Sequence, residues 1–179
     1  MDSKINKSAL DCIMTRTSVR SYSDKEISRE TVETILRAAM AAPSAMNKQP
    51  WHFFVIRGEQ LRDTIADTLE YGRQSLRNAK MAVVVAGDRS RFFEDVEAVD
   101  YWVEDCSAAA ENLLLAAHAL GLGAVWCGVY PIPGRIAQLR KATGLSEEFV
   151  PMCIIPLGYP AGVDEPKDKW DPDKVTYLD

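Results

Sequence analysis

The chain has 179 residues, of which 47% are hydrophobic and 26% are charged, and its formal net charge is −5. This length and composition predict one folded domain over residues 1–179 and exclude a disordered or fibrous chain. The acidic balance argues against nucleic acid as a partner, although the first 91 residues hold 15 basic and 11 acidic side chains and the remainder hold 6 and 15.

The cysteines and histidines give no sign of a metal site. The four cysteines form no CxxC pair, and the two histidines stand apart from them. Residues 1–14 lack the apolar core of a secretory signal, so we expect a cytoplasmic protein with reduced thiols. The longest apolar stretch, residues 113–123, is too short to span a bilayer, and no membrane association is expected.

Two capping residues mark the first helices. Ser8 followed by Asp11 predicts a short helix through residue 14, and residues 16–23 then read as extended. Ser28 caps a second helix, which Pro43 ends.

Periodicity in the rest of the chain predicts alternating strands and helices. The run WHFFVI at residues 51–56 and the run MAVVVA at residues 81–86 are typical of strands buried on both faces. Residues 175–178 also look like a strand. Further strands are predicted over residues 124–130 and 150–157, and helices over residues 59–71, 101–120 and 134–143. With no linker or repeat, this pattern indicates one α/β or α+β domain.

The extended segment carries a candidate phosphate site. Arg16, Ser18 and Arg20 are spaced by two residues, so their side chains project to the same side of an extended chain. Two guanidinium groups and a hydroxyl suit a phosphate, which takes several charge-assisted hydrogen bonds. The alternative is a solvated surface with two arginines.

A polar loop between two prolines, residues 43–50, is the second candidate. The prolines restrict the loop, so Ser44, Asn47 and Gln49 could present donors and acceptors to the edge of a planar heterocycle. Alternatively, the loop is an ordinary connector whose amide side chains bond to their own backbone.

Together these segments resemble a known family. The run RTSVRSY followed by APSAMNKQPWHF resembles the signature of the nitroreductase family of flavin enzymes, and NLLLAAHALGLG, AVWCGVY and PLGYP match it further along. The resemblance implies an α+β fold, an α/β sandwich with a central mixed, mainly antiparallel sheet flanked by helices. It also implies a homodimer with shared active sites, a C-terminal tail extending onto the partner subunit, and FMN reduced by NADH or NADPH.

The resemblance also assigns roles to individual residues. The Arg16–Arg20 segment and the tail residue Lys169, in preference to Lys167, would hold the FMN phosphate and ribityl chain. The 43–47 loop of the partner subunit would lie against the flavin ring, and residues 126–128 would approach flavin N5. The expected cofactor-binding residues are Arg16, Thr17, Ser18, Arg20, Pro43, Ser44, Ala45, Met46, Asn47, Trp126, Cys127, Gly128 and Lys169. Gln74 and Ser75 are further candidates for the flavin pyrimidine edge.

The expected activity is reduction of nitroaromatics, quinones or similar planar acceptors by a ping-pong mechanism. Flavin N5 carries the hydride, so no catalytic side chain is required. The alternatives are a flavin reductase or reductive dehalogenase of the same fold, or a non-catalytic FMN-binding protein. The acidic stretch 92–105 is either a lid in which Tyr101 or Trp102 stacks on a substrate, or a solvated helix start.

Overall fold

The computed structural model describes residues 8–95 and 100–178. Within this part of the chain, five strands form one sheet in the order β1-β2-β5-β3, with β4 also paired to β5. The strands are β1 (Trp51–Ile56), β2 (Met81–Asp88), β3 (Gly123–Ala124), β4 (Cys127–Gly128) and β5 (Phe149–Gly158). Their ladders are antiparallel, and a parallel bridge joins Ser18 to Ala124. The predicted α+β class with a mainly antiparallel sheet is confirmed.

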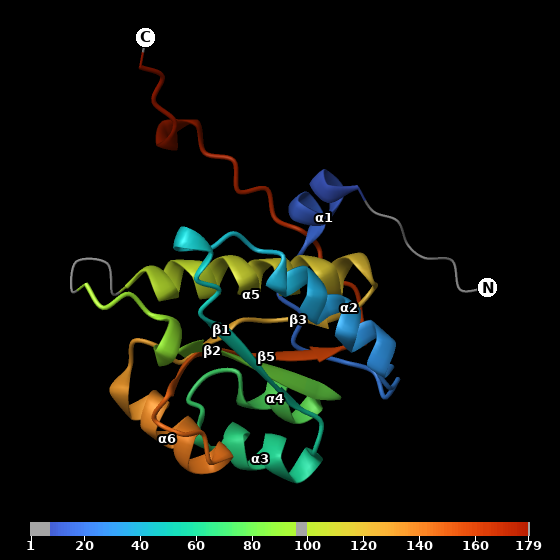
Figure 1. Ribbon diagram of the computed structural model, residues 1–179. Coiled ribbons are helices and arrows are strands. Elements are labelled where there is room, and N and C mark those ends of the chain that lie inside the picture. The colour runs from blue at the N-terminus through green and yellow to red at the C-terminus, as the bar shows by residue number, and fades with distance from the viewer. Residues whose placement is uncertain (1–7, 96–99, 179) are drawn as a thin grey trace.

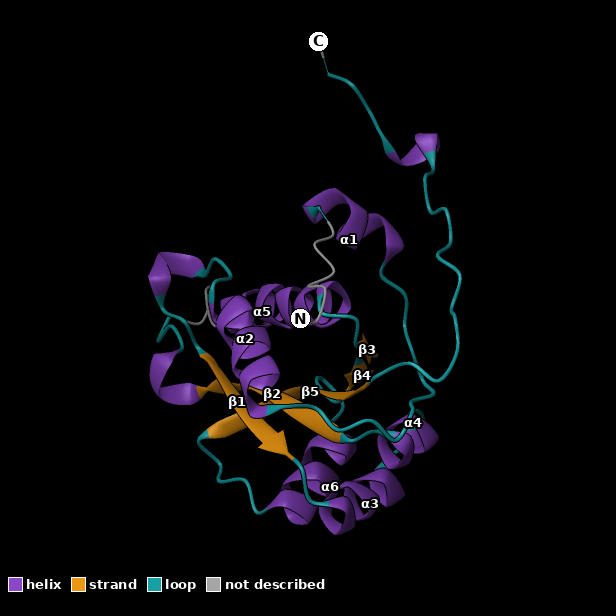
Figure 2. Ribbon diagram, turned by 90° about the vertical axis from the view of Figure 1, so that its right-hand side faces the viewer, coloured by secondary structure: helices purple, strands orange, loops and turns teal. Residues whose placement is uncertain are grey.

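Helices cover both faces of the sheet, as Figures 1 and 2 show. One layer holds α2 (Arg29–Met40) and α5 (Tyr101–Ala119). The other holds α3 (Glu59–Thr68), α4 (Arg73–Asn78) and α6 (Pro133–Thr143). Helix α1 (Ala9–Thr15) lies beyond α5, and the tail after β5 runs away from the body (Figure 2). Short 3₁₀ turns are η1 (Ala45–Asn47), η2 (Arg89–Arg91) and η3 (Pro172–Lys174).

Strand β2 lies at the centre of the core. Val83 and Val85 pack into the cluster that contains α5 side chains, whereas Val84 packs into the cluster on the α3 and α6 side. Successive side chains of a strand point to opposite faces, so a β-branched run suits a strand covered on both sides. The predicted two-sided burial of this strand is confirmed.

The capping residues act as predicted. The Ser8 side chain accepts a hydrogen bond from the Asp11 amide and the Ser28 side chain accepts one from the Thr31 amide, each at 3.1 Å. Each bond satisfies an amide that has no partner inside the helix, which fixes where the helix begins.

Strand β1 differs from the prediction of two-sided burial. It lies at the edge of the sheet, where His52 is exposed and Val55 is 38% exposed. An edge strand has a neighbour on one side only, so an apolar run alone does not determine how deeply it is buried.

Three other boundaries also differ. The predicted helix 59–71 ends at Thr68, and α4 follows Gly72, whose φ of +82° turns the chain. The predicted strand 124–130 divides into β3 and β4, which pair with β5 on either side of Val125 and Trp126. Residues 175–178 form no strand, since they extend into solvent without a partner strand in the described chain.

Candidate functional site

A cationic cavity of about 330 Å³ lies where the 16–20 segment meets the tail. The predicted phosphate ligands Arg16, Thr17, Ser18, Arg20 and Lys169 all line it, together with Lys167, Asp164 and Glu165. The four cations outnumber the two carboxylates, which leaves an excess of two positive charges. An excess of cations suits an anionic group such as a phosphate.

The residues that line this cavity are called the cationic cradle below. Close backbone packing holds its 16–20 segment in place. The Val19 amide donates to the Ala124 carbonyl at 3.1 Å, which keeps the segment extended. A Cβ at Gly123 would lie 2.5 Å from the Val19 side chain, so the close approach requires glycine. Glu111 on α5 then holds Arg16, with 3.5 Å between its Oε1 and the arginine Nε.

A second, adjacent cavity is lined by the predicted residues Trp126, Cys127 and Gly128. Arg20 lines both cavities, so one ligand with a phosphate at one end could extend from one into the other. Burial raises the pKa of the Cys127 thiol, and Arg20 opposes this with a smaller effect. The thiol is therefore largely protonated at neutral pH.

The α3–α4 turn forms the wall of this second cavity that the sequence analysis missed. Tyr71 and Gly72 line it, and a Cβ at Gly72 would lie 2.5 Å from the Cys127 sulfur. Of the two weaker candidates, Ser75 lines the cavity, whereas the Gln74 side chain donates to Asn78 at 2.8 Å on the surface. The glycine that breaks the helical pattern was the available signal for this wall.

The 43–50 loop adopts a defined conformation. Met46, Asn47 and Gln49 have φ values of 49°, 53° and 48°, which are costly for residues other than glycine. The Gln49 amide donates to Ser44 Oγ at 3.0 Å, and its side-chain amide donates to Asn47 Oδ1 at 2.8 Å. These polar groups bond within the loop, although the two amide side chains bond to each other and not to their own backbone as the alternative interpretation expected.

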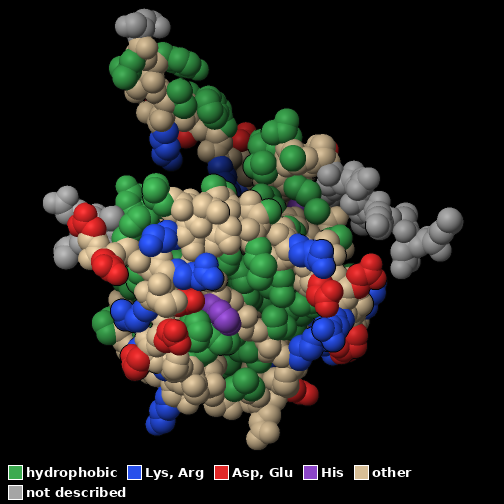
Figure 3. Space-filling model, in the orientation of Figure 1, with side chains coloured by type: hydrophobic (Ala, Val, Ile, Leu, Met, Phe, Trp, Pro, Cys, Tyr) green, Lys and Arg blue, Asp and Glu red, His purple; other side chains and the backbone are tan. Residues whose placement is uncertain are grey.

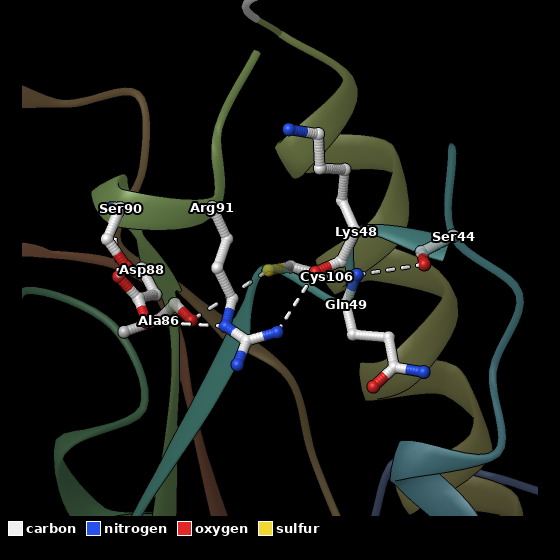
Figure 4. A network of polar contacts seen from close by, with 8 residues as sticks. All are labelled: Ser44, Lys48, Gln49, Ala86, Asp88, Ser90, Arg91 and Cys106. Carbon is white, nitrogen blue, oxygen red and sulfur yellow. Dashed lines mark hydrogen bonds and ion pairs between the residues drawn. The ribbon is translucent and has the colours of Figure 1, made fainter. Parts of the chain in front are cut away.

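Two neighbouring elements also bind this loop. Asp105 Oδ1 accepts from the Ala45 amide at 2.8 Å. From η2, Arg91 donates to the Lys48 carbonyl at 3.4 Å and pairs with Asp88 at 3.8 Å (Figure 4). The loop residues belong to neither cavity, so the described chain does not bring Pro43, Ser44, Ala45, Met46 or Asn47 to the cationic cradle.

The structure places Trp102 in the core, which corrects the expectation that it stacks on a substrate. Its side chain is 4% exposed, stacks on Phe92 at 5.0 Å and meets Tyr130 edge-on at 4.9 Å. Tyr101 is 45% exposed and lies 5.7 Å from the ring of Phe93. Residues 96–99 of the expected lid lie outside the described residues.

Residues 8–95 and 100–178 contain neither a cluster of metal-ligating side chains nor a membrane-spanning helix. No group of three or more His, Cys, Asp or Glu side chains there could hold a metal ion. Among the described helices, none is long and apolar enough to cross a membrane.

Comparison with known proteins identifies the family. The model of the Nitroreductase family matches residues 13–71 and 67–159. A relative from Methanothermobacter thermautotrophicus, named "Putative NADH dehydrogenase/NAD(P)H nitroreductase", is 42% identical over 98% of this chain and 90% of its own. The chain therefore belongs to the nitroreductase family.

Solved structures agree with this assignment. A protein from Bacteroides thetaiotaomicron with the same NADH dehydrogenase/NAD(P)H nitroreductase description superposes with a TM-score of 0.88 at 44% identity, covering 96% of this chain and 97% of that one. A protein from Desulfovibrio desulfuricans, solved in complex with FMN, gives a TM-score of 0.82 at 34% identity, covering 97% and 98%.

Proposed function

We propose that the protein is an FMN-dependent oxidoreductase that uses NADH or NADPH to reduce nitroaromatics, quinones or similar planar acceptors. The observation that carries this proposal is that Arg20 lines both the cationic cradle and the cavity beside Trp126. FMN has a phosphate at one end and a planar ring at the other, which suits two neighbouring cavities that share a lining residue. The FMN in the Desulfovibrio relative and the NAD(P)H in the name of the Methanothermobacter relative support the choice of cofactor and donor.

The donor groups of the cradle fit FMN. Arg16, Arg20 and Lys169 would hold the phosphate, and Ser18 and the Thr17 backbone would bond to the phosphate and ribityl oxygens. Gly128 has no side chain, so the backbone of residues 126–128 can approach a planar ring closely.

Bound FMN would supply the hydride acceptor and donor, and the chain would supply orientation and shielding. Trp126, which is 36% exposed, would cover part of the ring, while the arginines fix the opposite end of the cofactor. The protonated Cys127 thiol would add no negative charge beside the ring. No side chain is assigned a catalytic role.

We further propose a homodimer in which the 43–47 loop of each chain reaches the flavin of its partner. Met46 is 85% exposed although the loop has a fixed, strained shape, which is typical of a segment that completes a site elsewhere. Leu10 and Met14 on α1 and Trp170 in the tail are more than 70% exposed, and Figure 3 shows hydrophobic side chains in both places. A second copy that receives the tail would bury these side chains.

The spectrum of the purified protein tests the proposed function. A yellow protein that bleaches when NADH or NADPH is added without oxygen supports the oxidoreductase. Colour without bleaching favours the non-catalytic FMN-binding protein, and no colour after addition of FMN rules out both. Anaerobic stopped-flow reoxidation with nitroaromatics, quinones, free flavins and halogenated phenols then separates nitroreductase from flavin reductase and reductive dehalogenase.

Dilution tests the shared site. If the partner's loop contacts the flavin, then dilution to monomer should release FMN, which is measured by recovery of free-flavin fluorescence. A monomer that retains its FMN would contradict the shared site.

A further inference from the structure

The Asp105 carboxylate occupies a costly position in the fold. It lies on α5, its residue is 6% exposed, and Oδ2 is buried without a hydrogen-bond partner in the described structure. Burial raises the pKa of this carboxyl, although the hydrogen bond from the Ala45 amide opposes the effect. A buried charge that is only half satisfied does not serve packing, because an apolar side chain would fill the same space at lower cost.

In the described part of the chain, the Asp105 side chain makes its one hydrogen bond to the strained loop. Ala45 begins η1, a turn of three residues that is too short to stabilise itself. Met46 and Asn47 have positive φ and Met46 is almost fully exposed, so contacts from outside the loop add to the hydrogen bonds within it in stabilising this strained shape. The described structure gives residues 44–48 two hydrogen bonds with side chains outside the loop: the 2.8 Å bond to Asp105 is part-buried, whereas the 3.4 Å bond from Arg91 is long and exposed.

Helix α5 also carries the residue that holds the phosphate cradle. Glu111, six positions after Asp105, pairs with Arg16. Six residues of helix correspond to a rise of about 9 Å, so one rigid element fixes both the loop and the cradle.

We infer that Asp105 is a positioning residue, whose carboxylate sets the 43–47 loop in the conformation that meets the flavin. It lines neither cavity, and it acts through the Ala45 backbone rather than on the cofactor. The inference rests on the proposed flavin function. Asp105 and Glu111 lie on the same helix, α5. In each subunit this helix therefore fixes the loop that reaches the partner's flavin relative to the cavity that binds the subunit's own FMN.

Hydrogen exchange with and without FMN tests whether the hydrogen bond between Asp105 and the Ala45 amide holds the loop. In D105A the peptide covering residues 43–50 should exchange about tenfold faster or more, because the loss of the acceptor oxygen releases the Ala45 amide. The peptide covering β5 should not change. D105N, which keeps an oxygen facing Ala45, and E104Q, which removes the neighbouring exposed charge, should both behave like the wild type.

Flavin binding provides the second measurement. D105A should weaken FMN binding about tenfold or more and alter the visible circular dichroism of the bound flavin. D105N should keep the affinity and the circular dichroism of the wild type. Unchanged exchange in the loop, equal acceleration in every peptide, or a loosened loop with unchanged FMN affinity would each overturn the inference.

A second variant and a measurement on the wild type cover the case in which D105A does not fold. D105L removes the same acceptor while filling the space. In the wild type, an Ala45 amide that exchanges at the free-peptide rate would overturn the inference without any variant. Failure of the wild type to bind FMN would instead refute the proposed function, and exchange in the FMN-free protein would still decide whether Asp105 holds the loop.

Discussion

Replacing Arg16 with Gln should separate the two halves of the proposed FMN site. Its side chain is 18% exposed and lines the cationic cavity, so it would meet a phosphate in a partly desolvated setting. Hydrogen bonds to charged groups contribute about 1.5–3 kcal/mol. We therefore expect the Kd for FMN to rise about 10- to 150-fold. Riboflavin lacks the phosphate, so its Kd should change less than about twofold.

Quenching of flavin fluorescence at one fixed ionic strength measures both affinities. The loss of the Arg16–Glu111 pair should cost about 1 kcal/mol of stability or less because Glu111 is half exposed, and urea unfolding checks this. R29Q is the matched control, since Arg29 pairs with Glu33 on α2 and lies outside the cavity. Equal weakening of FMN and riboflavin, or an FMN affinity within about twofold of wild type, would refute the phosphate role.

Four further outcomes follow from the same contacts. K169Q should weaken FMN binding only about two- to fivefold, because exposed ion pairs contribute little, and riboflavin binding should be unaffected. G123A should lower the free energy of unfolding by about 1–3 kcal/mol, because its Cβ would lie 2.5 Å from Val19; urea denaturation measures this. Burial raises the pKa of Cys127, so its alkylation at pH 7 should be slower than that of a free thiol, and slower again with FMN bound. Mass spectrometry of the labelled peptide measures the rate, and labelling at the rate of a free thiol would contradict this prediction. Burial also raises the pKa of Asp105, so the folded state keeps this proton to higher pH than the unfolded state. The free energy of unfolding of the wild type should therefore fall relative to that of D105N as pH rises above the ordinary carboxyl range. A constant difference between the two proteins in urea unfolding from pH 4 to 7 would contradict this prediction.

The sequence by itself determined the features that depend on near neighbours. Ser8 and Ser28 begin helices because a cap needs only an amide two or three residues further on. Arg16, Ser18 and Arg20 line one cavity, as alternate residues of an extended chain should, although Thr17 between them lines it too. Family resemblance added the order of motifs, which the comparison with known proteins confirmed.

The tertiary structure decided which distant residues meet. Lys169 lines the cavity of Arg16 only because the tail passes the 16–20 segment as it leaves the body, and the edge position of β1 depends on which strands pair. The role of Asp105 was not visible in the sequence, where it belongs to an acidic helix start. Local patterns report interactions within a few residues, whereas its bond to Ala45 spans 60 positions and exists only after the chain has closed that loop.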